Sequence, residues 1–242
     1  MPREVVSELA PTGVLRAAIN MGNALLVTGR TRSGDPEGVA PDMAREIASR
    51  LGVPVVYVPY ARPGELADAA GSGVWDIGLI GAEPQRAEKI TFTPAYVEIE
   101  ATYLVPAGSP LKAVAEVDRA GVRIAVTARS AYDLWLERNI KHAQLIRAEG
   151  GDATFEQFVD EKLEALAGLR PRLVEDVQKL PGARILDGQF TAVQQAVGTA
   201  RQNTAGAAFL RDFVEEAKAS GIVAKLIERH KVVGRLSVAP RA

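Results

Sequence analysis

Cysteine is absent from this 242-residue chain, and histidine occurs only twice. The lack of cysteine excludes disulfides, thiolate metal sites and a cysteine nucleophile. His142 and His230 are far apart in the sequence, and neither has a neighbouring histidine or cysteine with which to hold a metal ion. We therefore predict no metal site and expect both histidines at the surface.

The sequence also lacks a large net charge and a long run of apolar residues. The formal net charge is -1, which gives no basic footprint for nucleic acid and no acidic tail. No stretch approaches the ~18 consecutive apolar residues of a membrane span, and residues 1–13 contain no apolar run of signal-peptide length. The chain is thus predicted to be either cytosolic or the mature form of an exported protein.

The common glycine motifs for cofactors and nucleophiles do not occur. There is no G-x-G-x-x-G after a predicted strand, no G-x-x-x-x-G-K-[ST] and no G-x-S-x-G. The nearest glycine cluster, Gly71-Ser72-Gly73, precedes a predicted strand and is typical of a turn. We predict that the protein uses no cofactor, and the case for an enzyme begins weakly.

What the sequence does contain is an alternation of short apolar runs with amphipathic helices, which predicts an α/β fold. Met43, Ile47 and Leu51 share one face of a helix that follows Asp42 and ends at Gly52. We expect further helices over 132–140, 155–166, 205–219 and 222–230. The expected strands cover 14–19, 53–58, 75–80, 103–106, 122–126, 144–147, 184–186 and 191–197.

Two domain organisations fit this pattern. One is a single doubly wound domain. The other has two lobes, with 1–104 plus 196–242 in lobe 1 and 105–195 in lobe 2, because the proline-rich break at 106–110 marks one crossing and 194–198 a second. Two crossings would form a hinge on which lobes close around a ligand. Periodicity alone does not choose between them.

Three segments in order resemble one protein family. Residues 75–105 contain a strand, the turn Glu83-Pro84, Arg86 and the run ITFTPAY; residues 38–52 read GVAPDMAREIASRLG; and residues 121–126, GVRIAV, are followed by Arg129-Ser130. Together they resemble the polar-amino-acid family of periplasmic solute-binding proteins, over about residues 13 to 230.

The resemblance implies a type II two-lobed α/β fold with a two-stranded hinge, and a non-catalytic periplasmic receptor that delivers its ligand to an ATP-driven membrane importer. We expect such a receptor to be a monomer. Arg86 matches the family arginine that clamps a ligand carboxylate, and Gly81 lies at the end of the strand before it. A planar guanidinium suits this task because it offers two parallel donors.

Departures from the family pattern point to the ligand. Glu83 replaces a hydroxyl residue, Leu169 takes the position of an aspartate that grips the α-ammonium, and Arg129 replaces the glycine of a "GT" turn that continues into Ser130. A buried ammonium needs a counter-charge. These departures from the family pattern favour a carboxylate-bearing solute, either an organic acid or an amino-acid-like molecule, with Glu83 gripping a ligand donor or pairing with Arg129.

Three further residues follow the first two predicted strands. Asn20 and Asn23 stand where the family presents a polar residue and an aromatic to the ligand, although asparagine is also a common turn former. Tyr60, just after the second strand, is a candidate substitute for the aromatic face.

Two other functions use the same fold. The family is similar to the cyclohexadienyl and arogenate dehydratases, but Leu169 and Arg172 occupy the positions of their aspartate and general-acid glutamate. The second alternative is a sensory module that binds the same kind of ligand.

Overall fold

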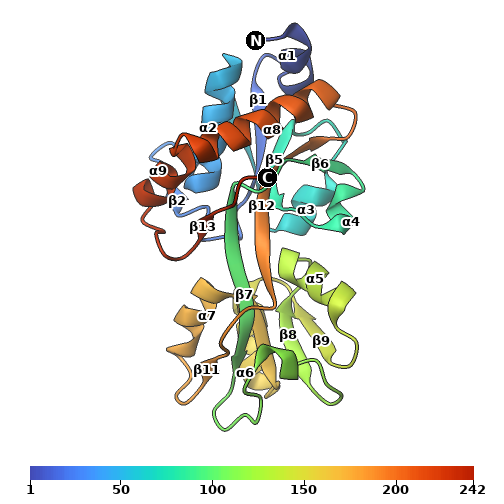
Figure 1. Ribbon diagram of the computed structural model, residues 1–242, viewed down its shortest axis with the longest axis vertical. Helices are drawn as coiled ribbons and strands as arrows, with labels where there is room; N and C mark the ends of the chain where they lie inside the picture. Colours follow the sequence, from blue (N-terminus) through green and yellow to red (C-terminus); the bar gives the residue numbers. More distant parts are fainter. The chain divides into compact units, whose positions relative to one another are not determined.

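The computed structural model describes all 242 residues, which divide into two compact units. Unit 1 comprises residues 1–98 and 194–242, and unit 2 comprises residues 99–193. The chain passes between the units within β7 (Val97–Val105) and again within β12 (Thr191–Ala200), the two long strands of Figure 1. The predicted lobe boundaries, at 104/105 and 195/196, lie inside the same two strands.

Unit 1 is built on a mixed sheet with the strand order β4-β1-β5-β12. The first three strands are parallel, whereas β12 runs antiparallel to β5, and β6 pairs with β12. The strands are β1 (Leu15–Asn20), β4 (Val55–Tyr60), β5 (Ile77–Gly81), β6 (Ile90–Phe92), β13 (Ser237–Val238) and a separate pair, β2 (Gly29–Arg30) with β3 (Pro36–Glu37). The helices are α1 (Arg3–Leu9), α2 (Val39–Leu51), α3 (Pro63–Asp68), α4 (Pro84–Ala87), α8 (Thr204–Ala219) and α9 (Ile222–Arg229).

The predicted helix before Gly52 is confirmed as α2. Met43, Ile47 and Leu51 are all buried on one face, as their spacing requires. Gly52 adopts φ 74°, the left-handed conformation that commonly ends a helix, and its N–H donates to the last turn. The helix begins at Val39 rather than after Asp42, so Asp42 lies in its first turn.

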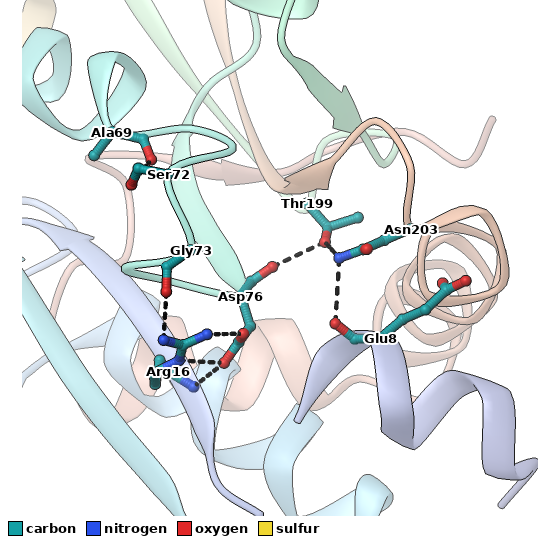
Figure 2. Close-up of polar contacts among 8 residues, drawn as sticks. All are labelled: Glu8, Arg16, Ala69, Ser72, Gly73, Asp76, Thr199 and Asn203. Atoms are coloured by element: carbon teal, nitrogen blue, oxygen red, sulfur yellow. Dashed lines mark hydrogen bonds and ion pairs between the residues drawn. The ribbon is translucent and has the colours of Figure 1, made fainter. Parts of the chain in front are cut away.

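A polar network lies at the amino ends of β1 and β5 and joins these two strands to β12 and α1 (Figure 2). Arg16 of β1 forms a bidentate pair with Asp76, with Nη2 2.6 Å from Oδ1 and Nε 3.0 Å from Oδ2. The Asp76 carbonyl accepts from the Thr199 hydroxyl at 2.8 Å, and Asn203 donates to Thr199 and to the Glu8 carbonyl. These bonds fix β1, β5, β12 and α1 against one another.

Unit 2 repeats the α/β plan with the strand order β7-β10-β8-β9. Strands β8, β9 and β10 are parallel, whereas β7 is antiparallel to β10 and also pairs with β11. The elements are β8 (Arg123–Thr127), β9 (Gln144–Ala148), β10 (Ala165–Leu169), β11 (Arg184–Ile185), α5 (Ala131–Asn139), α6 (Gly151–Asp160), α7 (Arg170–Val177) and a 3-10 turn at Val114–Glu116. Its core includes Tyr103, Ile124 and Leu136.

Two local predictions are wrong. The helix expected over 155–166 ends at Asp160, and the chain then enters buried strand β10. His230 was expected at the surface, but its side chain is only 6% exposed. Its Nε2 lies 2.7 Å from Oδ2 of buried Asp42, and this contact satisfies the polar atom inside the protein. Arg45 and Arg229 contact the same carboxylate.

No helix combines the length and the apolar character that crossing a membrane requires.

Candidate functional site

In unit 1 the candidate residues gather where the parallel strands end. Asn20 is the last residue of β1 and pairs in register with Tyr60, the last residue of β4. Gly81 ends β5, which is the other neighbour of β1. Carboxyl ends of parallel strands are where open α/β sheets present ligand contacts. The structure thus places three of the predicted residues at one edge of one sheet.

The two asparagines both form turns. The Asn20 side-chain oxygen accepts from the Gly22 N–H at 3.0 Å, and that of Asn23 accepts from the Leu25 N–H at 3.1 Å. Asn23 is buried, and its carbonyl also accepts from the following turn. These bonds are Asx turns, which fix the loop after β1.

Arg86 is 5% exposed, which is unusual for an arginine. It lies in α4, a single helical turn that begins with Pro84 at its first position. Its Nη1 donates to the carbonyl of Gly81 at 2.8 Å, so the end of β5 orients the guanidinium plane. Glu83, 8% exposed, immediately precedes α4, and its carbonyl accepts from the Arg86 N–H at 2.9 Å.

Tyr60 supplies an aromatic ring at the same edge. It packs against a cluster that includes Ala18, Leu66 and Ile80. A tyrosine phenol is neutral near pH 7 at its ordinary pKa, and burial raises the pKa of the Tyr60 hydroxyl further. The group can therefore act as a neutral hydrogen-bond donor beside the strand ends.

In unit 2 the pair Arg129-Ser130 joins β8 to α5. Ser130 is the N-cap of α5, and its hydroxyl oxygen accepts from the Asp133 N–H at 3.1 Å. Arg129 has φ 59°, the left-handed region, and its N–H donates to Oδ2 of Asp133 at 2.8 Å. Ser130 is buried, whereas Arg129 is exposed.

Asp133 is a structural residue of this turn that the sequence reasoning missed. It is 2% exposed, and Arg147 Nε lies 2.9 and 3.1 Å from its two oxygens. Burial raises the pKa of its carboxyl above the usual value, although the Arg129 N–H and Arg147 act against this rise. The spacing Ser130-x-x-Asp133 is the signal that would have found it, since a cap residue followed by an acid three positions later is typical of a helix start.

Leu169 and Arg172 lie at the end of β10 and in the first turn of α7. Arg172 is held by two carboxylates, with Nη2 2.7 Å from Asp152 and Nε 2.9 Å from Asp176. Neither position carries a group that could act as a general acid near neutral pH.

Comparison with known families decides the class of protein. Residues 18–232 match the bacterial extracellular solute-binding proteins, family 3. The chain belongs to that family. This family-3 protein is therefore a solute-binding protein, as the sequence motifs implied, and its family is one of extracellular binding proteins.

Solved structures agree on the fold of this family-3 protein. It is similar to a mutant of ArgBP from T. maritima, with 20% identity, a TM-score of 0.74, and coverage of 94% of this chain and 99% of that one. A putative binding component of an ABC transporter from Wolinella succinogenes, complexed with lysine, gives 20% identity, a TM-score of 0.74, and coverage of 90% and 95%. The predicted type II periplasmic-binding-protein fold is confirmed.

A curated relative is an enzyme. Cyclohexadienyl dehydratase of Pseudomonas aeruginosa is 26% identical over 165 residues, or 66% of this chain. The match spans 61% of the length of the dehydratase.

Proposed function

We propose that this family-3 protein is a receptor for a small carboxylate-bearing solute, an organic acid or an amino-acid-like molecule, and passes it to an ATP-driven membrane importer. It works in the periplasm, as a monomer and without catalysis. Open and closed forms of the two lobes exchange, and the ligand binds the closed form better. Lobe 1 comprises 1–104 and 196–242, and lobe 2 comprises 105–195. The two strands in which the chain crosses between the lobes, β7 and β12, act as the hinge.

The observation that supports the proposal is the buried guanidinium of Arg86. Its Nη1 donates to the Gly81 carbonyl. A planar guanidinium presents parallel N–H donors that match the geometry of a carboxylate. Asn20, Asn23, Tyr60 and Glu83 supply polar and aromatic contacts in the same unit. Arg129 and Ser130 supply contacts from unit 2. The positive charge of Arg86 and Arg129 favours an anionic ligand.

The test is calorimetric titration with carboxylates selected by a thermal-shift screen of organic acids, amino acids and amines, since a ligand that prefers the native state raises the melting temperature. Arg86→Ala is expected to weaken binding by roughly 2–4 kcal/mol, about 30- to 1,000-fold. Arg86→Lys should recover only part of the affinity because a point charge cannot form the fork.

The control is Arg32→Ala, which removes an exposed arginine of the same unit. It should leave affinity unchanged. Equal affinity of the wild type and Arg86→Ala for the selected carboxylate would remove Arg86 from the site.

The identity with cyclohexadienyl dehydratase favours one second candidate, a dehydratase. Leu169 and Arg172 argue against it, since neither can serve as the general acid that the resemblance assigns to this region. Turnover of prephenate by the purified protein, lost in Glu83→Gln, would establish the enzyme instead of the receptor.

A further inference from the structure

A pocket of about 220 Å³ lies in unit 1 between the neighbouring elements β6 and α8 (Figure 1). Thr91 and Phe92 line it from β6, and Arg201 lines it from the turn between β12 and α8. The remaining lining residues belong to α8. The pocket is therefore complete within unit 1.

This pocket lies at the sheet edge opposite to the candidate ligand site. β12 runs antiparallel to β5, and Thr199 of β12 pairs with Ile77 at the amino end of β5. Arg201 follows Thr199 by two residues, whereas Gly81 ends β5 at the other edge. At ~3.3 Å per residue, Arg201 and Gly81 are about 20 Å apart along the strands. The pocket shares no residue with the candidate ligand site.

One face of α8 forms the floor of the pocket. The spacing i, i+3, i+4, i+7, which places residues on one side of a helix, is occupied by Thr204, Ala207, Ala208 and Arg211. The two alanines leave the floor low, because their side chains end at Cβ. A helical side chain leans toward the N-terminus of its helix, so Arg211 extends back over the alanines. Arg201 and Arg211 thus face the same space from its two ends.

The charges of these two arginines are poorly neutralised. Nη1 of Arg201 lies 3.4 and 3.3 Å from the carbonyls of Ala87 and Glu88, which leaves the edge formed by Nε and Nη2 for another partner. The Glu88 side chain is exposed and forms no ion pair with Arg201. Arg211 pairs with Asp212 across 4.0 Å, and that carboxylate is 84% exposed, so the pair is weak.

The other acidic side chains near this part of α8 are engaged. Oε2 of Glu8 accepts from the Gly206 N–H at 2.6 Å, and the helical repeat places Gly206 on the face of α8 opposite to the pocket. Glu215 lies one turn beyond Arg211, and its Oε1 is 2.7 Å from Nζ of Lys218. The pocket therefore keeps an excess of positive charge.

We propose that this pocket is a second binding site of the protein, for a small phosphate monoester that is either free or part of a lipid. Its two negative charges match the two guanidinium groups, and its three terminal oxygens accept from them and from the hydroxyls of Thr91 and Thr204. The organic part lies over the alanine floor beside Phe92. The volume equals that of about seven water molecules, so the pocket holds the phosphoryl group and only a few carbon atoms.

Calorimetric titration with methyl phosphate tests the site. Binding should weaken as the ionic strength rises, because the arginines are exposed. Affinity should also be at least about threefold lower at pH 5 than at pH 7.5, since the second pKa of a phosphate monoester is about 6 and arginine stays charged. Cosedimentation with vesicles of phosphatidylcholine and phosphatidate, but not of phosphatidylcholine alone, would identify a lipid as the source; binding of methyl phosphate without cosedimentation would identify a free ester.

Variants of the pocket place the binding. Arg201→Ala with Arg211→Ala should weaken binding of methyl phosphate at least about tenfold, and the corresponding lysine pair should recover part of it. Ala208→Leu keeps a good helix former but fills the floor, and should have a similar effect. The matched control, Arg3→Ala with Arg32→Ala, removes two exposed arginines of the same unit and should leave the affinity unchanged. Melting temperatures check that all variants fold.

The outcomes keep this site separate from the proposed receptor function. Binding of methyl phosphate that survives Arg86→Ala but is lost in the pocket variants supports the second site. Binding lost in Arg86→Ala and retained in the pocket variants overturns the second site and leaves the receptor function standing. No binding of methyl phosphate, or equal affinity in every variant, also overturns it.

Discussion

Arg129 holds a backbone conformation that favours glycine. Its φ of 59° costs a residue with a Cβ atom about 1–2 kcal/mol. Glycine avoids this cost but loses about 0.5–1 kcal/mol through its greater freedom in the unfolded chain. Strained residues that persist in a fold cluster at functional sites, which agrees with a ligand role for this side chain.

We expect Arg129→Gly to be more stable than Arg129→Ala by about 1 kcal/mol, since only glycine relieves the left-handed strain. Urea denaturation of the two variants checks this. Both should weaken ligand binding equally, because both lack the guanidinium. An alanine variant as stable as the glycine variant would contradict the prediction.

Residue types at the site were predictable, but their local bonding was not. The motif around Arg86 predicted a guanidinium, and the motif around Arg129-Ser130 predicted a turn after a strand, but it did not predict that Ser130 is the N-cap of α5. No pattern showed that Arg86 would be oriented by Gly81 or that Asn23 would be buried in its own turn. Those features depend on the three-dimensional course of the loops after β1 and β5.

At the scale of elements, β10 shows where periodicity fails. Its sequence, ALAGL, contains good helix formers and no β-branched residue, so it extended the predicted helix beyond Asp160. In the structure the helix ends before Lys162, which has φ 51°. Ala165 to Leu169 are then placed between β7 and β8, where burial and strand pairing outweigh propensity.

The short strand β13 near the C-terminus was not predicted from the sequence. β13 pairs with Val97 and Glu98, which are the first two residues of β7 and belong to unit 1. The Ala239 N–H donates to the Tyr96 carbonyl at 3.1 Å. Lys218, whose side chain is 2% exposed, donates to the Pro240 carbonyl at 2.7 Å. The segment thus covers the start of the first crossing strand.

Deletion of residues 236–242 is expected to lower the free energy of unfolding by about 2–4 kcal/mol. It exposes apolar surface that Leu236 and Ala239 cover, and it removes a hydrogen-bond partner of a buried ammonium. Deletion of only the exposed residues 241–242 is the control and should cost less than about 1 kcal/mol. Chemical denaturation measures both, and equal effects would mean that the β13 pairing contributes nothing.

At the scale of the whole molecule, the two units differ in how the chain builds them. Unit 2 is one continuous segment, 99–193, and three of its buried clusters draw only on residues of that segment. Unit 1 is discontinuous: β12 pairs with β5 and β6, and the buried faces of α8 and α9 come from the far end of the chain. Composition alone could not reveal this difference, because it depends on where the two crossings fall.

This connectivity predicts that a fragment of residues 99–193 folds on its own, whereas a fragment of residues 1–98 does not. The first keeps its sheet β7-β10-β8-β9 and the Tyr103–Phe190 ring contact, with centroids 4.6 Å apart. The second loses the strand beside β5 and leaves Leu9 and Ile47 without the helices α8 and α9 that pack near them. Far-UV circular dichroism with a cooperative urea transition is the measurement. A non-cooperative 99–193 fragment would show that unit 2 needs unit 1 to fold, and the two units would then form one cooperative domain.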